Sequence, residues 1–460
     1  MAAFLVSTIV VMVPEGNCIT IQEERELSKA FMKVIRSQFR LIEDPIIVDY
    51  VNQVGKRILT VVPPQPFRYQ FYVIHEDTYN AFATPAGHIF INSGLFAALE
   101  SEEELAGIIG HEISHVVCRH ISDRIENSKK IGMATLAGMV AGVLLGVGGV
   151  GAAASAVTIG SVAAGQTAAL AYSRENEMQA DQLGLVYLTQ AGYSGAGLLT
   201  SLKKIRSKQW YGSEQIPTYL TTHPASELRM SYIDNWLNHN PAENTGKQID
   251  TGAFDLAHTR LTALYTDEKI ALNHFKSELD ESPGDPLAHY GYALTLMRGE
   301  KGHEAAVHMK QAIEGNAMAT HMLQDLGRIY FQDGQYQKAM QALLAGNSDK
   351  NPEGQLYLGR TQMELGRMAE AKDTFENLVR DNGNYSQAYY YLGESSGRLG
   401  DMFGAHYNLG RFYLQMGDRK NAGFHLNRAL KLAVDDARKK AVRHQLEELG
   451  PKKKRKPGAG

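Results

Sequence analysis

The stretch SEEELAGIIGHEISHVVCRH, residues 101–120, decides the fold of the amino-terminal half of this chain. Its apolar residues recur every three or four positions, and Ser101 followed by Glu104 is typical of a helix start. The HEISH segment therefore lies inside a predicted helix. Because residues four apart on a helix share one face, His111 and His115 can direct both imidazoles to one metal ion.

Glu112 lies between the two histidines and is displaced by one position around the predicted helix. From there it can reach a water molecule at the metal without taking a coordination position, which suits a general base. The alternative is a solvated face of three polar side chains. The apolar residues on both sides of HEISH argue against it, because a buried carboxylate and two buried imidazoles need partners, and a cation supplies one.

A second helix is predicted over residues 173–192, where Gly192 provides the expected stop. We expect its apolar side to consist of Met178, Leu185 and Val186. Packed against the HEISH helix, a helix of this kind can present a carboxylate to the same metal ion.

Two acidic residues of this second helix, Glu177 and Asp181, are four apart and share a face. Glu177 can complete a His, His, Glu ligand set and leave a fourth position for water. Asp181 can accept a hydrogen bond from a ligand histidine and fix its tautomer. Glu175 competes for the ligand role but faces elsewhere on the helix. His120 is out of phase with the metal and lies either at the surface or behind a ligand.

Three segments taken together resemble one family of zinc metallopeptidases. They are HEISHVVCRH at 111–120, SRENEMQAD at 173–181, which matches an R-x-x-E-x-x-A-D pattern, and TTHPASELRM at 221–230. The family includes HtpX, the CAAX prenyl proteases and the mitochondrial protease Oma. The chain looks most similar to its BepA-like branch, which carries carboxyl-terminal tetratricopeptide repeats. The resemblance extends from about Ile21 to Leu449, and the order of the three motifs is far more specific than HExxH alone.

The resemblance implies that His111, His115 and Glu177 bind one Zn²⁺ ion per chain. It gives Glu112 a catalytic role, and the helical spacing adds Asp181 to the catalytic group. In such enzymes the histidine of the T-H-P segment can lie at the metal and restrain activity, and the arginine that follows is placed near the substrate. The corresponding residues here are His223 and Arg229. Without the resemblance, His223 is a loop histidine before a proline.

The chain is predicted to be α+β and mostly helical, with a metallopeptidase domain over residues 21–250 and an all-α tetratricopeptide solenoid over 251–449. Strand-like runs at 68–75 and 87–96 supply the β component. The segment 80–95 resembles the family's strand beside the cleft. Its edge could pair with an extended substrate through backbone hydrogen bonds, or the strand could be internal.

The stretch 131–172 has no ionisable side chain except Tyr172 and is rich in Gly, Ala, Val and Leu. It is long enough for one or two membrane helices, and its spaced glycines permit close helix contact. Because Ala and Gly contribute little transfer free energy, we favour a helical hairpin on the catalytic domain that touches a bilayer surface rather than crossing it. An integral membrane protease is the alternative.

The solenoid, of about four repeats, is predicted from glycines that recur near the tetratricopeptide period of about 34 residues. These glycines are Gly291, Gly327, Gly359, Gly393 and Gly410. Alanine follows three of them after twelve residues, and a large residue follows two of these alanines after four more. The short step from Gly393 to Gly410 indicates that the last repeats share a helix or are degenerate. The alternative is an unrelated helical bundle.

Both ends of the chain are expected to lie outside the folded domains. The apolar run 4–13 has the length of a signal-peptide core, so residues 1–20 are predicted to be an export signal. A buried strand or a misplaced start codon is the alternative, because MAA lacks the usual positive charge and EGNC is not a small-x-small cleavage site. Residues 450–460, which contain KKKRK, are predicted to be a disordered basic tail.

The charge composition of the chain gives no indication of a nucleic-acid partner. Lys and Arg number 47 against 50 Asp and Glu, a net charge of −3, so no overall field favours nucleic acid. The two cysteines are too few for a disulfide framework.

The resemblance implies an exported, periplasmic zinc endopeptidase that cleaves misfolded or stalled envelope proteins. Its repeats would bind unfolded clients or an outer-membrane assembly partner, because concave solenoids usually bind peptides or proteins. The rival hypothesis, from another class, is a chaperone or adaptor for outer-membrane protein assembly in which proteolysis is latent.

Overall fold

The structure, a computed structural model, describes residues 19–127, 172–210, 218–224, 226–241, 251–315, 320–348 and 351–450. It divides into two compact units, residues 1–266 and 267–460. Three predictions lie outside the described residues: most of the export signal, the uncharged stretch up to residue 171, and the basic tail from residue 451. Within the described part, no helix is both long enough and apolar enough to cross a bilayer.

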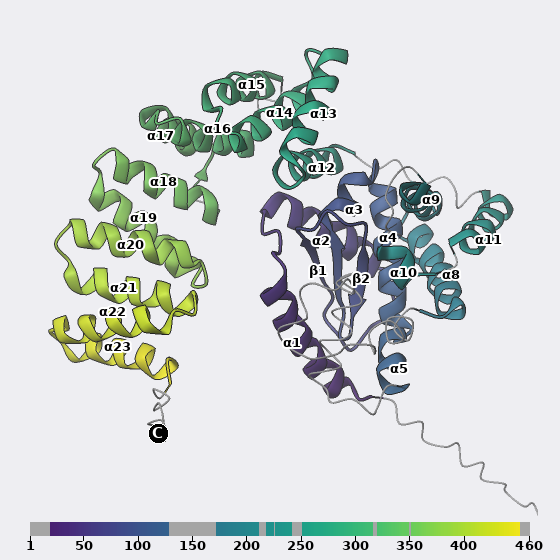
Figure 1. Cartoon of the computed structure of the whole chain (residues 1–460), viewed down its shortest axis with the longest axis horizontal. Helices are drawn as coiled ribbons and strands as arrows, with labels where there is room; N and C mark the ends of the chain where they lie inside the picture. Colours follow the sequence, from purple (N-terminus) through teal and green to yellow (C-terminus); the bar gives the residue numbers. More distant parts are fainter. Residues whose placement is uncertain are drawn as a thin grey trace, which may run out of the picture. The chain divides into compact units, whose positions relative to one another are not determined.

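A three-stranded sheet lies in the first unit (Figure 1). β1 (Gln70–Ile74) runs parallel to β3 (His88–Asn92), and β2 (Ala81–Thr84) pairs with β3 in the antiparallel direction. The predicted run 68–75 contains β1 and the run 87–96 contains β3, but residues 93–96 of the second run are helical. Because the strand order is β1-β3-β2, β3 is internal and the edge in the segment 80–95 belongs to β2.

Helices make up most of the first unit. They are α1 (Ile21–Gln38), α2 (Pro45–Leu59), α3 (Ser93–Ala98), α4 (Glu102–Val117), α5 (His120–Asn127), α8 (Arg174–Gln190), α9 (Ala196–Trp210), α10 (Thr218–Thr222), α11 (Ser226–His239) and α12 (Gly252–Tyr265). α4 packs on β2 and β3, and both α8 and α9 pack on α4 (Figure 1). The helix predicted to carry HEISH therefore lies at the centre of this unit.

The N-terminus of α4 is capped as predicted at Ser101, whose hydroxyl accepts a hydrogen bond from the backbone N–H of Glu104. In a full capping box, the carboxylate of Glu104 would accept a hydrogen bond from the backbone N–H of Ser101. Here it accepts one from the backbone N–H of Glu100, the preceding residue. Further along, a Cβ at Gly107 would lie 2.6 Å from the backbone nitrogen of Leu198. Glycine at this position lets α9 approach α4 closely.

The prediction for α8 is right about its extent and wrong about its apolar side. Met178 and Val186 are 42% and 40% exposed, whereas Leu185 is buried. Glu177 and Asp181 are fully buried on the face that packs against α4. A polar site occupies this face, so the usual rule that a helix buries its large apolar residues does not hold here.

α12 packs on α2 and α3, within the first unit. Phe254 and Leu261 belong to its hydrophobic core. The guanidinium of Arg260 donates to the buried Asp44 carboxylate over 2.6 Å, at the N-cap of α2. The first compact unit thus extends to Thr266, beyond residue 250, the predicted end of the metallopeptidase domain.

The second unit is a row of helices in which each packs on the next (Figure 1). They are α13 (Glu268–Glu281), α14 (Pro286–Arg298), α15 (Gly302–Gly315), α16 (Thr320–Gln332), α17 (Tyr336–Ala345), α18 (Pro352–Glu364), α19 (Met368–Asp381), α20 (Ser386–Arg398), α21 (Met402–Gln415), α22 (Arg419–Leu432) and α23 (Asp436–Glu448). The predicted all-α solenoid is confirmed.

The predicted glycines lie where neighbouring helices approach most closely. A Cβ at Gly291 would lie 2.3 Å from the ring of Phe275, and one at Gly359 would lie 2.6 Å from the ring of Phe375. Each large side chain therefore fills the space that the glycine leaves open.

Helix α21 belongs to two successive helix pairs. Gly393 of α20 faces Leu409 of α21, and Gly410 of α21 in turn faces Leu426 of α22. The half-period step between these glycines is explained by a shared helix, one of the two possibilities that the sequence left open.

Candidate metal centre

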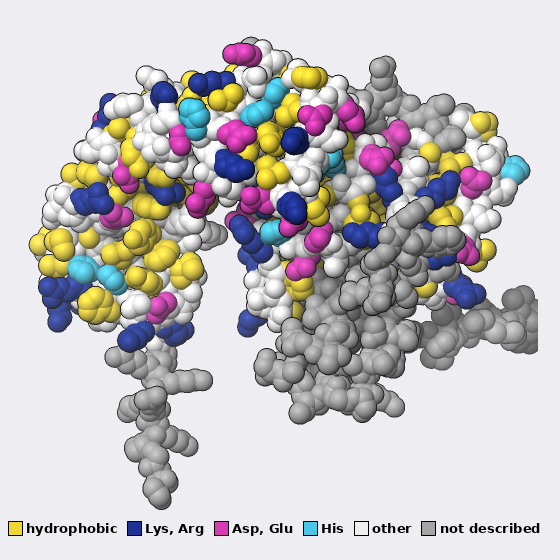
Figure 2. Space-filling model, turned by 45° about the horizontal axis from the view of Figure 1, so that its top comes forward, with side chains coloured by type: hydrophobic (Ala, Val, Ile, Leu, Met, Phe, Trp, Pro, Cys, Tyr) yellow, Lys and Arg dark blue, Asp and Glu magenta, His cyan; other side chains and the backbone are white. Residues whose placement is uncertain are grey.

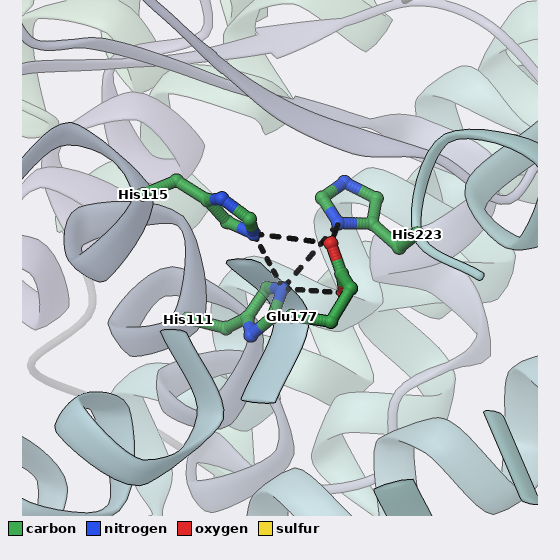
Figure 3. A group of neighbouring side chains, drawn as sticks. All are labelled: His111, His115, Glu177 and His223. Carbon is green, nitrogen blue, oxygen red and sulfur yellow. Dashed lines mark hydrogen bonds and ion pairs between the residues drawn. The ribbon is translucent and has the colours of Figure 1, made fainter. Parts of the chain in front are cut away.

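Four side chains from three parts of the chain converge inside the first unit (Figure 3). His111 and His115 project from α4, Glu177 projects from the first turns of α8, and His223 directly follows α10. All four are fully buried. One nitrogen or oxygen from each lies within 4.8 Å of the corresponding atoms of the others.

The spacing of these donor atoms fits a single small cation. Nε2 of His111 lies 3.0 Å from Nε2 of His115. Oε1 of Glu177 lies 3.4 Å from Nε2 of His115 and 3.0 Å from Nδ1 of His223, and Oε2 of the same carboxylate lies 3.4 Å from Nε2 of His111. Tetrahedral coordination with bonds of about 2.0–2.1 Å requires donors about 3.3 Å apart. The observed spacings of 3.0–3.4 Å match that edge length.

Glu112 also indicates that a group is to be accommodated here. Both oxygens of its carboxylate are buried, and neither forms a hydrogen bond within the described part of the chain. Its nearest ionic neighbour is Nε2 of His223, 3.5 Å away. A buried carboxylate without hydrogen bonds is costly, so the residues present fit a metal ion with a water molecule beside Glu112.

Asp181 orients the first histidine. Its Oδ1 lies 2.8 Å from Nδ1 of His111 and accepts the proton of that nitrogen, so Nε2 of His111 is directed at the other donors. The same carboxylate accepts hydrogen bonds from Arg229 and Tyr232. Its position is therefore fixed from several directions.

His120 orients the second histidine, from behind rather than from the surface. It is 2% exposed, and its Nε2 lies 3.0 Å from Oε1 of Gln179, an atom that can only accept. Nδ1 of neutral His120 is then an acceptor for Nδ1–H of His115, 3.0 Å away. This chain of bonds leaves the lone pair of His115 Nε2 directed at the donor group.

Arg229 is enclosed between two carboxylates. It is 2% exposed, lies 2.6 Å from Oε2 of Glu177, and donates to Asp181 through two nitrogens at 2.7 Å each. Burial acts to raise the pKa of both carboxyl groups, but Arg229 and the neighbouring histidines outweigh it and hold both pKa values below their usual range. Both groups are therefore ionised, which suits a site that could hold a cation.

The remaining ionisable groups have contrasting pKa values. Burial lowers the pKa of His115, so this imidazole is neutral. Burial and Arg229 act to lower the pKa of His111 as well, but Asp181 outweighs them and raises it to about 9. A metal ion must therefore displace a proton from His111. Burial raises the pKa of Glu112, which moves this carboxylate towards the range of a general base at neutral pH.

Residues 49–237 match peptidase family M48, and tetratricopeptide repeats match at 320–346, 353–384 and 403–435. The first unit of this chain contains an M48 peptidase domain. The predicted family and fold class are confirmed, and the chain is a metallopeptidase with carboxyl-terminal tetratricopeptide repeats.

Known relatives agree with this assignment. The chain is 27% identical to the beta-barrel assembly-enhancing protease of Escherichia coli strain K12 over 397 residues, which cover 84% of this chain and 79% of the relative. It is 30% identical to a putative protease of the same name from Vibrio cholerae over 61% of this chain and 58% of the relative. It is 24% identical to the mitochondrial metalloendopeptidase OMA1 of Schizosaccharomyces pombe over 48% of this chain and 63% of the relative.

Three tyrosines beside the donor group were not predicted from the sequence. Tyr172 stacks on His115 with ring centroids 3.8 Å apart, and Tyr219 stacks on His223 at 4.4 Å. Tyr232 donates to Asp181 from α11, three residues after Arg229. Of the three tyrosines, only Tyr232 carried a usable signal, because its spacing from Arg229 places both on one helix face.

Glu175, the competing candidate, lies on the outer side of α8. It is exposed, as the helical spacing predicted, and it is absent from the donor group. Glu177 is therefore the carboxylate of this segment that meets the histidines of α4.

Proposed function

We propose that this metallopeptidase binds one Zn²⁺ ion per chain through His111, His115 and Glu177 and cleaves internal peptide bonds of unfolded proteins. The observation that carries the proposal is the buried donor group with the unbonded carboxylate of Glu112 beside it. Nitrogen and carboxylate donors at tetrahedral spacing are typical of zinc sites.

Each residue has a separate role in this mechanism. When bound, Zn²⁺ supplies a Lewis acid that polarises a peptide carbonyl and makes water more acidic. Glu112 takes the proton of the attacking water and later delivers it to the leaving amine. Asp181 and Arg229 act indirectly, because Asp181 orients His111 and Arg229 holds the carboxylates of Asp181 and Glu177. We propose this positioning role for Arg229 in place of the expected one near the substrate.

The test of Glu112 is the Glu112→Gln variant, assayed with unfolded casein and by metal analysis. The amide keeps the shape of the side chain but cannot accept a proton, so we expect unchanged zinc content and a loss of proteolysis by about 10²-fold or more. Glu175→Gln, an exposed change on α8, is the matched control and should leave both quantities unchanged. Full activity of Glu112→Gln would remove the role of general base.

We further propose that the enzyme is exported to the periplasm and acts on misfolded or stalled outer-membrane proteins, which its repeats hold or pass to an assembly partner. The name of the Escherichia coli relative supports the class of client. Figure 2 shows apolar side chains exposed on the solenoid, and in the last repeats Leu399, Met402, Met416 and Phe424 are 46–64% exposed. Such a surface suits an unfolded chain.

The client role of the repeats can be tested with two substrates. Leu399→Ser with Phe424→Ser should slow cleavage of a urea-denatured β-barrel protein, because capture by the repeats is lost. It should not slow cleavage of a short peptide, which the M48 domain alone can bind. Equal rates for wild type and variant on the denatured protein would contradict this role. Alkaline extraction of a membrane fraction tests the alternative of an integral membrane protease, since a peripheral protein is released and a spanning one is retained.

A second candidate, a chaperone or adaptor with latent proteolysis, is favoured by one observation. Nδ1 of His223 belongs to the donor group, where it can take the position that a substrate carbonyl or water needs. We propose that His223 is a fourth ligand that restrains activity. His223→Ala should then cleave casein faster than the wild type, and a slower rate would show that His223 assists catalysis. In cells that lack the wild-type protein, the Glu112→Gln variant can be supplied in its place. Restored assembly of the client protein would favour the chaperone hypothesis, because this variant is not expected to cleave.

A further inference from the structure

A charged trough lies in the first unit, apart from the metal centre. Its volume is about 910 Å³, and its walls are α1 on one side and the segment 65–70 with the start of β3 on the other. Five of its lining residues are cationic: Arg25, Lys29, Lys33, Arg36 and Arg68. None of the residues that line it is acidic. This is an uneven distribution for a chain whose overall net charge is −3.

The cations of α1 form a single stripe. Arg25, Lys29, Lys33 and Arg36 follow one another at intervals of four, four and three residues, which places them on one face of the helix. At a rise of about 1.5 Å per residue the stripe is about 16 Å long. Arg68 adds a positive charge from the opposite wall.

Most of these charges have no partner in the described part of the protein. Lys29 pairs with Glu26, and Arg25 donates to the backbone oxygen of Pro66, which joins the two walls. Lys33, Arg36 and Arg68 are exposed and form no ion pair with any described residue. These three side chains are therefore available to a negatively charged ligand.

The trough also has a polar group in need of a partner. The hydroxyl of Ser28, which lines it from α1, is 3% exposed and forms no hydrogen bond within the described residues. Between the cations, Met32 and Phe67 contribute apolar surface from opposite walls, beside the polar side chains of Gln22, Gln65, Gln70 and His88. The surface thus offers positive charge, apolar contact and a buried hydroxyl within one concave site.

We propose that this trough binds an acidic segment of another polypeptide in extended conformation. A stripe of about 16 Å matches about five residues of extended chain at about 3.3 Å each. A flat bilayer would touch only the rims of a two-walled trough, whereas its mixed lining of Met32, Phe67 and three glutamines can contact the backbone and side chains of a peptide. The proteolytic mechanism uses none of these residues, so the trough is an additional interaction site.

The test uses the full-length protein and a fluorescein-labelled octaglutamate peptide, with octaglutamine as the uncharged probe. Fluorescence anisotropy should show binding of octaglutamate that weakens as salt is added, because exposed charges are screened. Lys33→Glu with Arg36→Glu should weaken it by about tenfold or more, since each reversal replaces attraction by repulsion. Lys56→Glu with Lys203→Glu makes the same change of net charge at exposed sites outside the trough and should have little effect.

Two results would overturn the proposal. The first is octaglutamate binding that is absent in the wild type or equally affected by both double variants. The second is trough-dependent binding to vesicles of phosphatidylglycerol and phosphatidylcholine without binding of the peptide, which would identify a membrane contact instead. Thermal unfolding of each variant checks that it folds. No step uses proteolysis, so failure here is distinct from failure of the zinc peptidase mechanism.

Discussion

The two units bury different chemistry where their helices meet. In the M48 domain, α4, α8 and α11 meet through His111, Glu177, Asp181 and Arg229, each at most 2% exposed. In the solenoid, neighbouring helices meet through a glycine on one side and a large apolar residue on the other, as Gly359 does with Phe375. Buried charges depend on one another, so one substitution affects the whole group. The apolar contacts act locally, between one helix and the next.

The largest expected difference is between a buried and an exposed arginine. Arg229→Leu leaves the Glu177 and Asp181 carboxylates buried without their cation and should destabilise the metal-free M48 domain by about 3–5 kcal/mol. Arg398→Leu removes one side of the exposed pair with Glu394 and should cost much less. Urea unfolding of both variants measures the difference. Equal losses would mean that the buried network does not act as a unit.

The solenoid should respond to volume instead of charge. Gly359→Ala places a Cβ 2.6 Å from the Phe375 ring and should destabilise the repeats by about 1–3 kcal/mol. Gly423→Ala, also within a helix, places its Cβ 3.8 Å from Leu449 and should stabilise by up to about 1 kcal/mol through helix propensity. Urea unfolding should therefore show changes of opposite sign in the free energy of unfolding of the two variants. Their zinc content should be unchanged. Loss of zinc in either variant would contradict the separation of the two regions.

Within the M48 domain, the supporting histidine should affect metal affinity more than the fold. His120→Leu removes the acceptor that fixes the tautomer of His115 and should weaken zinc binding by about 10–100-fold, measured by competition with a chelator. Gln179→Leu should act in the same direction but less strongly, because it acts through His120. His239→Leu, an exposed histidine on α11, is the control. Unchanged affinity in His120→Leu would show that the bond to His115 does not position the ligand.

The smallest expected effect concerns two histidine pairs of the solenoid. Nδ1 of His289 lies 2.8 Å from Nδ1 of His308, and the corresponding distance between His406 and His425 is 3.0 Å. Burial, followed by the partner histidine, lowers the pKa of His308 and of His425. A histidine with a lowered folded-state pKa stabilises the fold above its unfolded pKa of about 6.5, and this contribution is lost as the pH falls below that value.

The solenoid should therefore unfold at lower urea concentration at about pH 5 than at about pH 8, by about 1 kcal/mol, the contribution of one hydrogen bond. His308→Gln with His425→Gln should flatten this dependence. His303→Gln, at an exposed position, should leave it unchanged. A pH profile that is the same in all three proteins would exclude these pairs as its cause.

The sequence predicted what depends on local spacing. The HEISH helix, the face shared by Glu177 and Asp181, and the glycines of the repeats all follow from helical periodicity, and the structure contains each of them. The pairing of Asp181 with His111 could also be anticipated, because a ligand histidine needs an acceptor for its other nitrogen.

The contacts that escaped prediction join distant parts of the chain. Arg229 meets Asp181 across 48 positions, and no periodicity links them. Tyr172 stacks on His115 from the end of a stretch that offered no polar pattern. The apolar side of α8 was misjudged at Met178 and Val186 because the buried face of this helix carries the polar site. Periodicity cannot show that a site has replaced the hydrophobic stripe.

Metal content of the purified full-length protein, by elemental analysis before and after Glu177→Ala, tests the proposed zinc site most directly. We predict about one zinc per chain in the wild type, because the donor group is sized for a single ion, and loss of that zinc in the variant. The solenoid should unfold at the same urea concentration in both. Wild-type protein without zinc, or a Glu177→Ala variant that keeps it, would contradict a metal centre built from α4 and α8.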